Sequence, residues 1–330
     1  MTRLAILGAG AWGTALAQAA ARAGSQVTLW GRDAALMDEI ATARCNERYL
    51  PGVALEPAIE ATAALEAAAE AEALLLVAPA QHTRALAERL APLIPPSCPL
   101  VICAKGIEQG SGLLMSEVLA EALPGRPLAV LSGPTFAAEV ARGLPAAITL
   151  AAEDQVLAEG LIASLGSRAF RPYLSNDPIG AQIGGAVKNV IAIACGIVAG
   201  RSLGDNARAA LITRGLAEIV RLGLAKGGQR ETLMGLSGLG DLLLTCSAMQ
   251  SRNFSLGAAL GEGRALADIL AERRTVAEGV HSASSVSTLA ARLQVEMPIV
   301  EAVDQVINQG AQIDQTIAGL LARPFKAESL

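Results

Sequence analysis

The apolar residues in the first half of the chain fall into short runs, separated by segments with helix-forming or turn-forming composition. Short apolar runs that alternate with helices are typical of buried strands in a parallel sheet. Such runs occur at residues 4–7, 26–30, 73–77, 100–103, 128–131, 147–150 and 169–174, with helices expected at 14–23, 56–72 and 83–90. We therefore predict an α/β domain, a Rossmann-like doubly wound sheet, in residues 1–174.

The pattern changes after the turn-rich segment 172–178, which reads PYLSNDP. From there on, apolar residues recur with the spacing of buried or amphipathic helices, and strand-like runs stop. Helices are expected at 179–200, 209–226, 258–273, 282–293 and 299–309. We therefore predict a second domain in residues 175–330 that is all-α.

The first predicted strand is followed at once by a glycine-rich turn, GAGAWG at residues 8–13. This GxGxxG pattern opens a strand–helix–strand unit. Gly8 permits the tight turn, Gly10 lets a pyrophosphate approach the backbone, and Gly13 lets the helix lie close to the strand. The helix N-terminus then faces the phosphates. A bare GxGxxG is a weak signal, but in this context it indicates a dinucleotide-binding site.

The residues after the second strand bear on the choice of cofactor. An acidic residue that ends this strand would bind the ribose hydroxyls of NAD, whereas an arginine suits the 2′-phosphate of NADP. Here Arg32 precedes Asp33, so the order favours NADP(H), while Asp33 leaves NAD(H) open. We expect NADP(H) to be preferred.

Later strands also end in loops of small or polar residues. Lys105 follows the strand at 100–103, and the loop SGPTFA at residues 132–137 follows the strand at 128–131. In a parallel sheet the carboxyl ends of the strands share one edge, where ligands bind. We expect Lys105 and this loop at the cofactor edge, although a lysine at a strand end also occurs as a solvated surface charge.

The segment 184–196, GGAVKNVIAIACG, carries a single charge, Lys188, among small and aliphatic residues. Such a run should form a largely buried helix. A lysine is rarely buried without a partner, because desolvation of its ammonium group is costly. From these residues alone, two interpretations stay open. Lys188 either extends along an apolar wall with its head in solvent, or points into a water-poor cleft as a proton carrier or anion ligand.

A second glycine-rich segment, GLSGLGD at residues 235–241, is followed by Thr245 and by the tripeptide Ser251-Arg252-Asn253. Glycines that permit close backbone approach, followed by Ser-Arg-Asn, suit an anion site in which Arg252 is a fork for phosphate. The alternative from composition alone is a plain flexible loop.

Composition narrows the classes of function. The net charge is −5 and no basic run occurs, so nucleic acid is not expected as a partner. Five cysteines, without a CxxC motif, indicate reduced thiols in a cytoplasmic protein. The two histidines, His82 and His281, are far apart, so neither a metal site nor a Ser-His-Asp triad is expected. Ordered glycines break the N-terminal apolar run and Lys188 interrupts the most apolar later stretch, so neither a signal peptide nor membrane insertion is expected.

Taken together, these segments resemble the bacterial type of NAD(P)-dependent glycerol-3-phosphate dehydrogenases over nearly the whole chain. The run GAVKNVIAIACG at residues 185–196 matches the family's signature and is the most specific stretch. GAGAWGTALA, SGPTFAAEV, LSGLGDL, SRNFSLG and VAEGVHSA are similar to further family segments in the expected order. The first of these has Ala11 where the family usually has serine, at a position that contributes its backbone.

The resemblance implies reversible reduction of dihydroxyacetone phosphate to sn-glycerol 3-phosphate, a phospholipid precursor, by a homodimer without a metal. Lys188 would be the general acid/base; Lys105 would lower its pKa, and Asp241 would raise the pKa and orient the side chain. The implied substrate contacts are Lys105, Gly133, Thr135, Lys188, Asp241, Ser251, Arg252 and Asn253. The implied nucleotide contacts, besides Gly8, Gly10, Ala11 and Gly13 of the turn, are Trp12, Arg32, Tyr49, Lys105, Ala137, Arg252, Val276 and Glu278.

Two other functions stay open from the sequence. A ketopantoate or 3-hydroxyacid reductase would have the same two-domain design and a lysine on a helix, although the anion site around Arg252 favours a phosphorylated substrate. A non-catalytic NADP(H) sensor would signal by domain closure, but would not need Lys188 inside an apolar helix. The expected partner is therefore a small phosphorylated molecule, and the helix of Lys188 is expected where the two domains meet.

Overall fold

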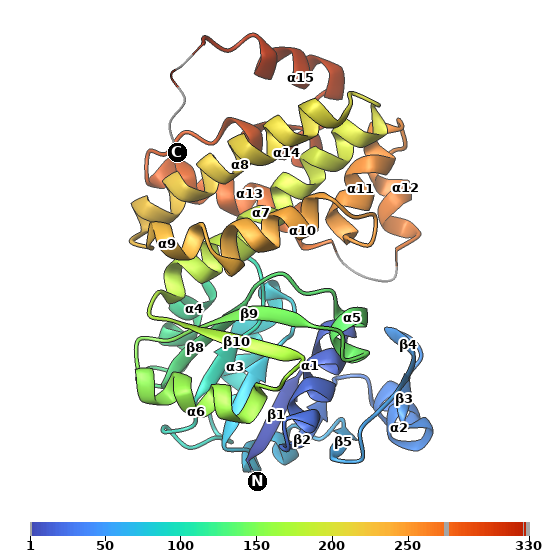
Figure 1. The fold of residues 1–330 in the computed structure, drawn as a ribbon, viewed down its shortest axis with the longest axis vertical. Helices are drawn as coiled ribbons and strands as arrows, with labels where there is room; N and C mark the ends of the chain where they lie inside the picture. Colours follow the sequence, from blue (N-terminus) through green and yellow to red (C-terminus); the bar gives the residue numbers. More distant parts are fainter. Residues whose placement is uncertain (1, 274–276, 326, 328–330) are drawn as a thin grey trace. The chain divides into compact units, whose positions relative to one another are not determined.

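The computed structural model describes residues 2–273, 277–325 and 327. The chain forms two compact units (Figure 1). The first comprises the residues up to Ala104 together with Met115–Pro178, and the second comprises Lys105–Leu114 and the residues from Ile179 onward. The Rossmann-like first part and the helical second part that the sequence predicts are both present.

The first unit is built on an eight-stranded sheet in the order β10-β9-β8-β7-β6-β1-β2-β5. The mutually parallel strands are β1 (Arg3–Leu7), β2 (Gln26–Trp30), β5 (Ile59–Thr62), β6 (Ala73–Leu76), β7 (Leu100–Ile102) and β8 (Leu128–Ser132). Their order is that of a dinucleotide-binding fold, in which the strand order reverses beside β1. The crevice at that reversal is where such folds bind nucleotides.

The last two strands depart from the parallel arrangement of the rest of the sheet. β9 (Ala146–Ala151) pairs antiparallel with β8, and β10 (Phe170–Ser175) pairs parallel with β9. A parallel connection needs a crossover element that spans the sheet. The only helix between β8 and β9 is the five-residue α5 (Ala137–Ala141), which is too short for that crossover.

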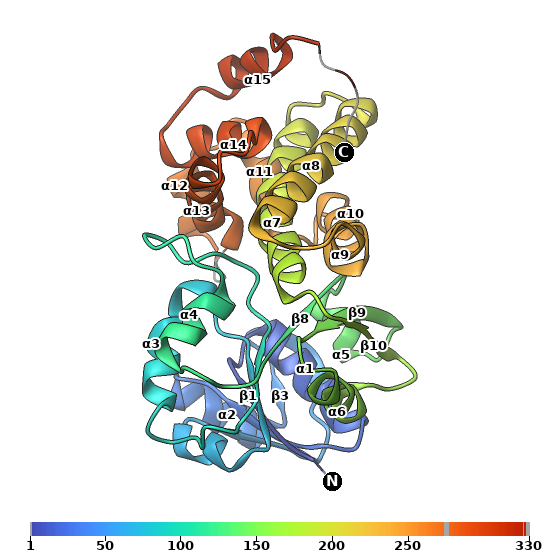
Figure 2. The same ribbon diagram turned by 90° about the vertical axis from the view of Figure 1, so that its left-hand side faces the viewer.

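Helices cover both faces of this sheet (Figure 2). The pair α3 and α4 packs on one face, and α1 packs with α5 and α6 on the other. Besides α5, the helices of this unit are α1 (Ala11–Arg22), α2 (Ala34–Ala43), α3 (Thr83–Leu90), α4 (Met115–Ala122) and α6 (Gln155–Leu165). A small antiparallel pair, β3 (Cys45–Asn46) and β4 (Leu50–Ala54), follows α2.

The helix predicted for residues 56–72 does not form. The segment instead contains β5 and the 3₁₀ helix η1 (Leu65–Glu70). Ile59 is fully buried and pairs with Val27 of β2, so the segment extends the sheet. Its alanine-rich composition favours a helix, but burial beside β2 overrides that local preference.

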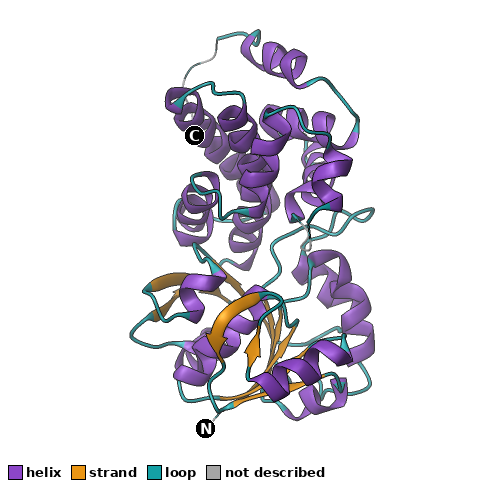
Figure 3. Cartoon of the chain, turned by 90° about the vertical axis from the view of Figure 1, so that its right-hand side faces the viewer, coloured by secondary structure: helices purple, strands orange, loops and turns teal. Residues whose placement is uncertain are grey.

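The described residues from Ile179 onward form helices and no strand, as Figure 3 shows by colour. The helices are α7 (Pro178–Gly200), α8 (Asp205–Lys226), α9 (Arg230–Leu233), α10 (Asp241–Cys246), α11 (Arg252–Gly261), α12 (Leu266–Ala271), α13 (Glu278–Arg292), α14 (Pro298–Asn308) and α15 (Ile313–Leu321), with a π-helical turn η3 (Leu236–Gly240) before α10. The single helix predicted at 258–273 is two helices, because Gly263 adopts a left-handed conformation (φ +93°) between them.

The central helix of the second unit is α7. By length and composition it could cross a membrane, but 78% of its most apolar 18-residue stretch is buried inside the protein. Its apolar residues share one hydrophobic cluster with residues of α8, α10, α11, α13 and α14. Helix α7 is therefore packed as the core helix of a globular unit.

The segment Lys105–Leu114 was predicted to belong to the first domain but belongs to the second unit. Ile107 and Leu114 are buried in the same cluster as α7, and Asn189 Nδ2 donates a hydrogen bond to the carbonyl of Lys105 over 3.1 Å. The later division lies after Pro178 rather than after residue 174. The position of the segment along the chain does not predict which unit it joins, because only its tertiary contacts assign it to the second unit.

Candidate active site

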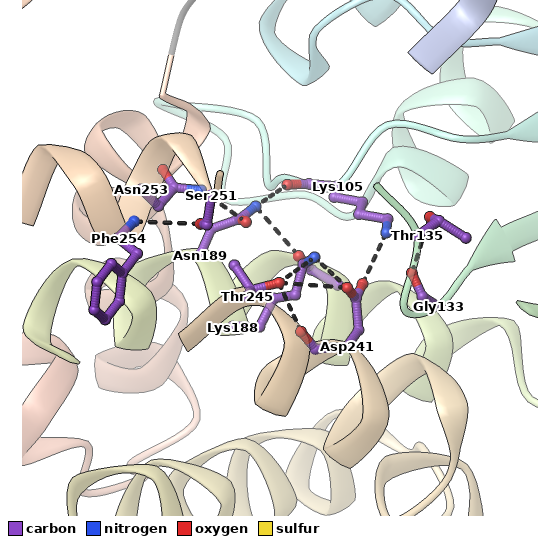
Figure 4. A network of polar contacts seen from close by, with 11 residues as sticks. Lys105, Gly133, Thr135, Lys188, Asn189, Asp241, Thr245, Ser251, Asn253 and Phe254 are labelled. Carbon is purple, nitrogen blue, oxygen red and sulfur yellow. Dashed lines mark hydrogen bonds and ion pairs between the residues drawn. The ribbon is translucent and has the colours of Figure 1, made fainter. Parts of the chain in front are cut away.

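The ammonium group of Lys188 lies inside the second unit and is hydrogen-bonded there. The residue is 6% exposed. Its Nζ donates to Asp241 Oδ1 over 2.5 Å and to Thr245 Oγ1 over 2.9 Å (Figure 4). The interpretation in which Lys188 extends its head into solvent is therefore wrong. A buried lysine with two fixed partners has a defined position for its remaining N–H group.

Asp241 joins the two lysines of the site. Its side chain is 1% exposed, and Oδ2 lies 2.7 Å from Lys105 Nζ while Oδ1 contacts Lys188. The strand-end lysine is thus no solvated surface charge, because its side chain is only 14% exposed. Two cations share one carboxylate, so the three groups together carry a charge of +1. A mostly buried excess of positive charge suits a bound anion or an oxygen that becomes negative during a reaction.

The pKa of Lys188 is lowered to about 8. Burial is the largest cause, because it disfavours the charged ammonium. The charge of Asp241 raises the pKa and the charge of Lys105 lowers it. These directions are the ones the sequence predicts for both residues. A lysine with a pKa near 8 is able to give up and regain a proton close to neutral pH.

The second glycine-rich segment is ordered, so the alternative of a plain flexible loop is wrong. It forms the π-helical turn η3, which runs directly into α10. A Cβ atom at Gly184 of α7 would lie 2.4 Å from the carbonyl oxygen of Ser237, and one at Gly238 would lie 1.8 Å from that of Leu233. The glycines therefore let η3 pack against its neighbours, and this packing fixes Asp241 at the start of α10.

The Ser-Arg-Asn tripeptide lies at the start of α11, and its three side chains differ in role. Ser251 caps the helix by accepting a hydrogen bond from the Phe254 amide. Arg252 is exposed. Asn253 is buried, and its Nδ2 donates to Asn189 Oδ1 over 2.9 Å. The exposed guanidinium is therefore the member of the three that is most accessible to a ligand from solvent, while Asn253 keeps a second N–H on its Nδ2.

A chain of hydrogen bonds connects this tripeptide to the lysine site. Asn189, beside Lys188 on α7, accepts from Asn253 and donates to the backbone of Lys105. Asn253 Oδ1 in turn accepts from the Gly279 amide over 3.0 Å. Glu278, the first residue of α13, is next to that amide. The second unit thus gathers seven predicted site residues: Lys105, Lys188, Asp241, Ser251, Arg252, Asn253 and Glu278. The predicted contact Val276 lies outside the described residues.

Close helix packing brings α11 to α7. A Cβ at Gly257 would lie 2.0 Å from the carbonyl oxygen of Ile193, and one at Gly196 would lie 2.1 Å from that of Phe254. Side chains at these positions would force the helices apart. The small residues of the α7 segment thus serve the approach of a neighbouring backbone.

The predicted cofactor turn in the first unit has the geometry that a dinucleotide needs. Gly8 has φ +133°, and a Cβ at Gly13 would lie 1.7 Å from the carbonyl oxygen of Gly8, so both positions require glycine. A Cβ at Gly10 would meet no atom within 4 Å, which leaves room for a phosphate. No side chain caps α1, and among the described residues the buried Nε1 of Trp12 has no hydrogen-bond partner. These donors fit a bound nucleotide.

The other predicted contacts of the first unit lie at strand ends. Arg32 follows β2 and is exposed, and Tyr49 lies in the turn between β3 and β4. Gly133 and Thr135 follow β8, with Thr135 Oγ1 donating to the Gly133 carbonyl over 3.2 Å. Ala137 begins α5. The predicted site residues thus lie in both units, and the location of α7 where the domains meet stays a prediction.

Sequence reasoning did not assign a site role to Thr245 or Asn189. Thr245 accepts from Lys188 and donates to the backbone carbonyl of Asp241 over 2.6 Å. Its spacing of four residues from Asp241 on one helix was the available signal. Asn189 was visible only as the neighbour of Lys188. Its role depends on contacts with segments far away in the chain.

Known protein families match the sequence of both units. The family model for the N-terminus of NAD-dependent glycerol-3-phosphate dehydrogenase matches residues 3–158, and the model for its C-terminus matches residues 177–318. The chain is 58% identical over 327 residues to a glycerol-3-phosphate dehydrogenase (NAD(P)+) of Parvibaculum lavamentivorans, covering 99% of this chain and 98% of that protein. It is 59% identical over 326 residues to one of Rhodospirillum rubrum, covering 98% and 93%. A crystal structure of glycerol-3-phosphate dehydrogenase from Coxiella burnetii superposes with a TM-score of 0.94 at 41% identity, covering 98% of this chain and 99% of that one.

Proposed function

Because this chain belongs to the NAD-dependent glycerol-3-phosphate dehydrogenases and is an oxidoreductase with a nicotinamide cofactor, we propose that it reduces dihydroxyacetone phosphate reversibly to sn-glycerol 3-phosphate. In the cell this reaction would supply the backbone of glycerophospholipids. The observation that carries the proposal is the buried Lys188 ammonium, which Asp241 and Thr245 hold beside a second lysine. Such a group is a positioned proton donor for a ketone.

Lys188 acts as the general acid/base of the proposed reaction. The nicotinamide, when bound, supplies the hydride to the ketone carbon. An ammonium group has three N–H donors, and Asp241 and Thr245 engage two of them. The third is directed to the carbonyl oxygen of the substrate, where it stabilises the developing negative charge and then transfers its proton. In the oxidation direction the neutral amine takes the proton back from the hydroxyl group.

Asp241 and Lys105 have opposite effects on the pKa of Lys188. The carboxylate orients Lys188 and keeps it charged, whereas the second cation makes loss of the proton easier. The Lys105 ammonium also adds positive charge for the substrate oxygens. Together they support proton donation in one direction and proton uptake in the other.

The pH profile should follow the lowered pKa of Lys188, about 8. Reduction needs the ammonium form, so its rate should be constant below this pKa and fall about tenfold per pH unit above it. Oxidation needs the amine, so its rate should rise with pH up to the pKa and then level off. Initial rates in both directions at saturating substrate provide the measurement. A reduction rate that continues to rise above pH 9, roughly one unit past this pKa, would contradict the role of Lys188.

Arg252 and Asn253 bind the substrate phosphate in this proposal. The Arg252→Ala variant should raise the KM for dihydroxyacetone phosphate about tenfold or more, because it loses a charge-assisted contact, with a smaller change in kcat. Steady-state kinetics at fixed NADPH measure both constants. Arg323→Ala, which removes an exposed arginine paired with Glu296, is the control for loss of charge. If dephosphorylated dihydroxyacetone serves the unmodified enzyme equally well, the phosphate has no such role.

Oxidation of NADPH by dihydroxyacetone phosphate, by ketopantoate and without a ketone tests the reaction itself. Turnover with the first substrate alone is expected. Preference for ketopantoate would favour the alternative reductase, and binding of NADPH without turnover would favour the non-catalytic sensor. Relatives that share more than half of their residues with this chain are named glycerol-3-phosphate dehydrogenase (NAD(P)+). That name supports the proposed reaction over both alternatives.

We further propose that NADP(H) is preferred over NAD(H), and that the enzyme is a cytoplasmic homodimer. Arg32 after β2 supports the cofactor preference, because it suits a 2′-phosphate. All five cysteines are free thiols, which suits a reducing compartment. Fluorescence titration with both nucleotides and light scattering test the first and last of these proposals.

A further inference from the structure

The turn between β3 and β4, formed by Glu47, Arg48 and Tyr49, is tied to the cofactor turn of the first unit. Asn46, which precedes it, is fully buried. Its Nδ2 donates to the carbonyl of Ala9 over 3.0 Å and to Thr14 Oγ1 over 2.8 Å, while its Oδ1 accepts from the Tyr49 amide. One buried side chain thus holds this turn against the GxGxxG backbone and the first turn of α1.

Asp33 is the residue that would bind the ribose hydroxyls of NAD, but both of its carboxylate oxygens have partners. Oδ1 accepts from the Leu36 amide over 3.2 Å and caps α2. Oδ2 pairs with Arg48 over 3.0 Å. The carboxylate is therefore held by its own helix and by a cation, which weakens it as an acceptor for ribose hydroxyls.

We propose that Arg48 determines cofactor specificity together with Arg32, by neutralising Asp33 and binding the 2′-phosphate of NADP(H). The Arg48 side chain is 49% exposed, and its guanidinium lies 5.3 Å from the centre of the Tyr49 ring. One nitrogen faces Asp33, so further N–H groups of the fork are left for phosphate oxygens. Without Arg48, the charge of Asp33 would repel the phosphate dianion.

This inference rests on the proposed preference for NADP(H), and it extends that preference to a residue outside the βαβ motif. The usual signal lies directly after the second strand. Arg48 comes from a separate hairpin, and only the contacts of Asn46 and Asp33 place it beside that strand end. Its role depends on nucleotide binding and not on the identity of the ketone.

Binding of nucleotides to the free enzyme tests the inference without any turnover. Isothermal titration of the Arg48→Gln variant should show NADP⁺ and 2′,5′-ADP bound about tenfold or more weakly, as for loss of one charge-assisted phosphate contact. Binding of NAD⁺ and 5′-AMP should change less than about twofold. Arg48→Lys keeps the charge but loses the planar fork of the guanidinium. Its affinity for NADP⁺ should therefore lie between those of the unmodified enzyme and Arg48→Gln. Arg168→Gln removes an exposed arginine of the same unit, and is the control for net charge.

A second variant tests the role of Asp33. Asp33→Asn keeps an oxygen that caps α2 and removes the negative charge. It should bind NAD⁺ as the unmodified enzyme does and NADP⁺ at least as tightly. Marked loss of NAD⁺ binding would show that the Asp33 carboxylate binds the ribose hydroxyls, and would overturn the inference.

The outcomes separate this inference from the proposed function. If the unmodified enzyme binds NADP⁺ and NAD⁺ equally, the cofactor preference itself fails and Arg48 has nothing to determine. If it prefers NADP⁺ and Arg48→Gln keeps the preference or weakens both nucleotides equally, only the inference fails. Reduction of dihydroxyacetone phosphate is measured independently in every case.

Discussion

Replacing Lys188 with methionine should lower kcat for dihydroxyacetone phosphate about 10²-fold or more, the usual scale for loss of a general acid/base. In the proposed mechanism this ammonium group donates the proton to the carbonyl oxygen, and no other described lysine contacts both Asp241 and Thr245. Affinity for NADPH should stay unchanged, because Lys188 is not among the proposed nucleotide contacts and the glycine-rich cofactor turn lies in the other unit. The kinetic loss should thus appear without a loss of cofactor binding.

The fold should survive this substitution. Methionine replaces the buried stem, and Lys105 still pairs with Asp241 over 2.7 Å, so the carboxylate is not left without a cation. Lys188→Arg is an informative second variant, because it restores the charge but cannot release its proton near neutral pH. Lys226→Met, at the end of α8, is the control for removal of a lysine. Normal turnover of Lys188→Met would remove the general acid/base assignment.

The elements that sequence predicted correctly are those whose pattern is local. The cofactor turn combines a strand, three glycines and a helix within the first residues of the chain. Helix α7 is long and apolar, so its existence and burial follow from composition alone. Its lysine stood out because a charge in such a helix requires a special environment.

The elements that sequence missed depend on contacts between distant segments. Lys105–Leu114 lies between a strand and a helix of the first unit, yet buries Ile107 and Leu114 in the second. Similarly, β5 forms because β2 offers it a buried edge. Local propensity has no information on either partner.

The arrangement of the site residues also depends on contacts between distant segments, which local sequence patterns do not reveal. The sequence indicated Lys188, Asp241 and Lys105 as separate candidates, each with a structural alternative. What decides between the alternatives is that both lysines share the two oxygens of one buried carboxylate. That geometry is set by the packing of η3 on α7, which depends on backbone approach at Gly184. Resemblance to a family suggested the roles of these residues, and the observed contacts give a physical basis on which the roles are proposed.

The Gly257→Ala variant should lower the free energy of unfolding by about 3 kcal/mol, the upper range for overpacking in a core. A Cβ at this position would lie 2.0 Å from the Ile193 carbonyl oxygen and 3.0 Å from the Cα of Gly196, and neither backbone atom is able to move without shifting a helix. Helices α7 and α11 must therefore separate or bend. Denaturant unfolding measures the loss of stability.

The same displacement should affect catalysis in the fraction that stays folded. Helix α11 carries Arg252 and Asn253, and the Asn253–Asn189 hydrogen bond of 2.9 Å links it to the helix of Lys188. Moving the proposed phosphate anchor relative to the proposed proton donor should raise the KM for dihydroxyacetone phosphate and lower kcat together.

A matched control separates steric overlap from the general effect of a methyl group. Gly319→Ala lies in α15 of the same unit, where an added Cβ meets no atom within 4 Å. That variant should be as stable as the unmodified protein or more stable by about 0.5–1 kcal/mol, because alanine favours helix over glycine. If Gly257→Ala unfolds at the same denaturant concentration as Gly319→Ala, close contact of the two helices is not what positions the phosphate anchor. If only Gly257→Ala is destabilised and loses kcat, the distance between α7 and α11 is a determinant of the reaction.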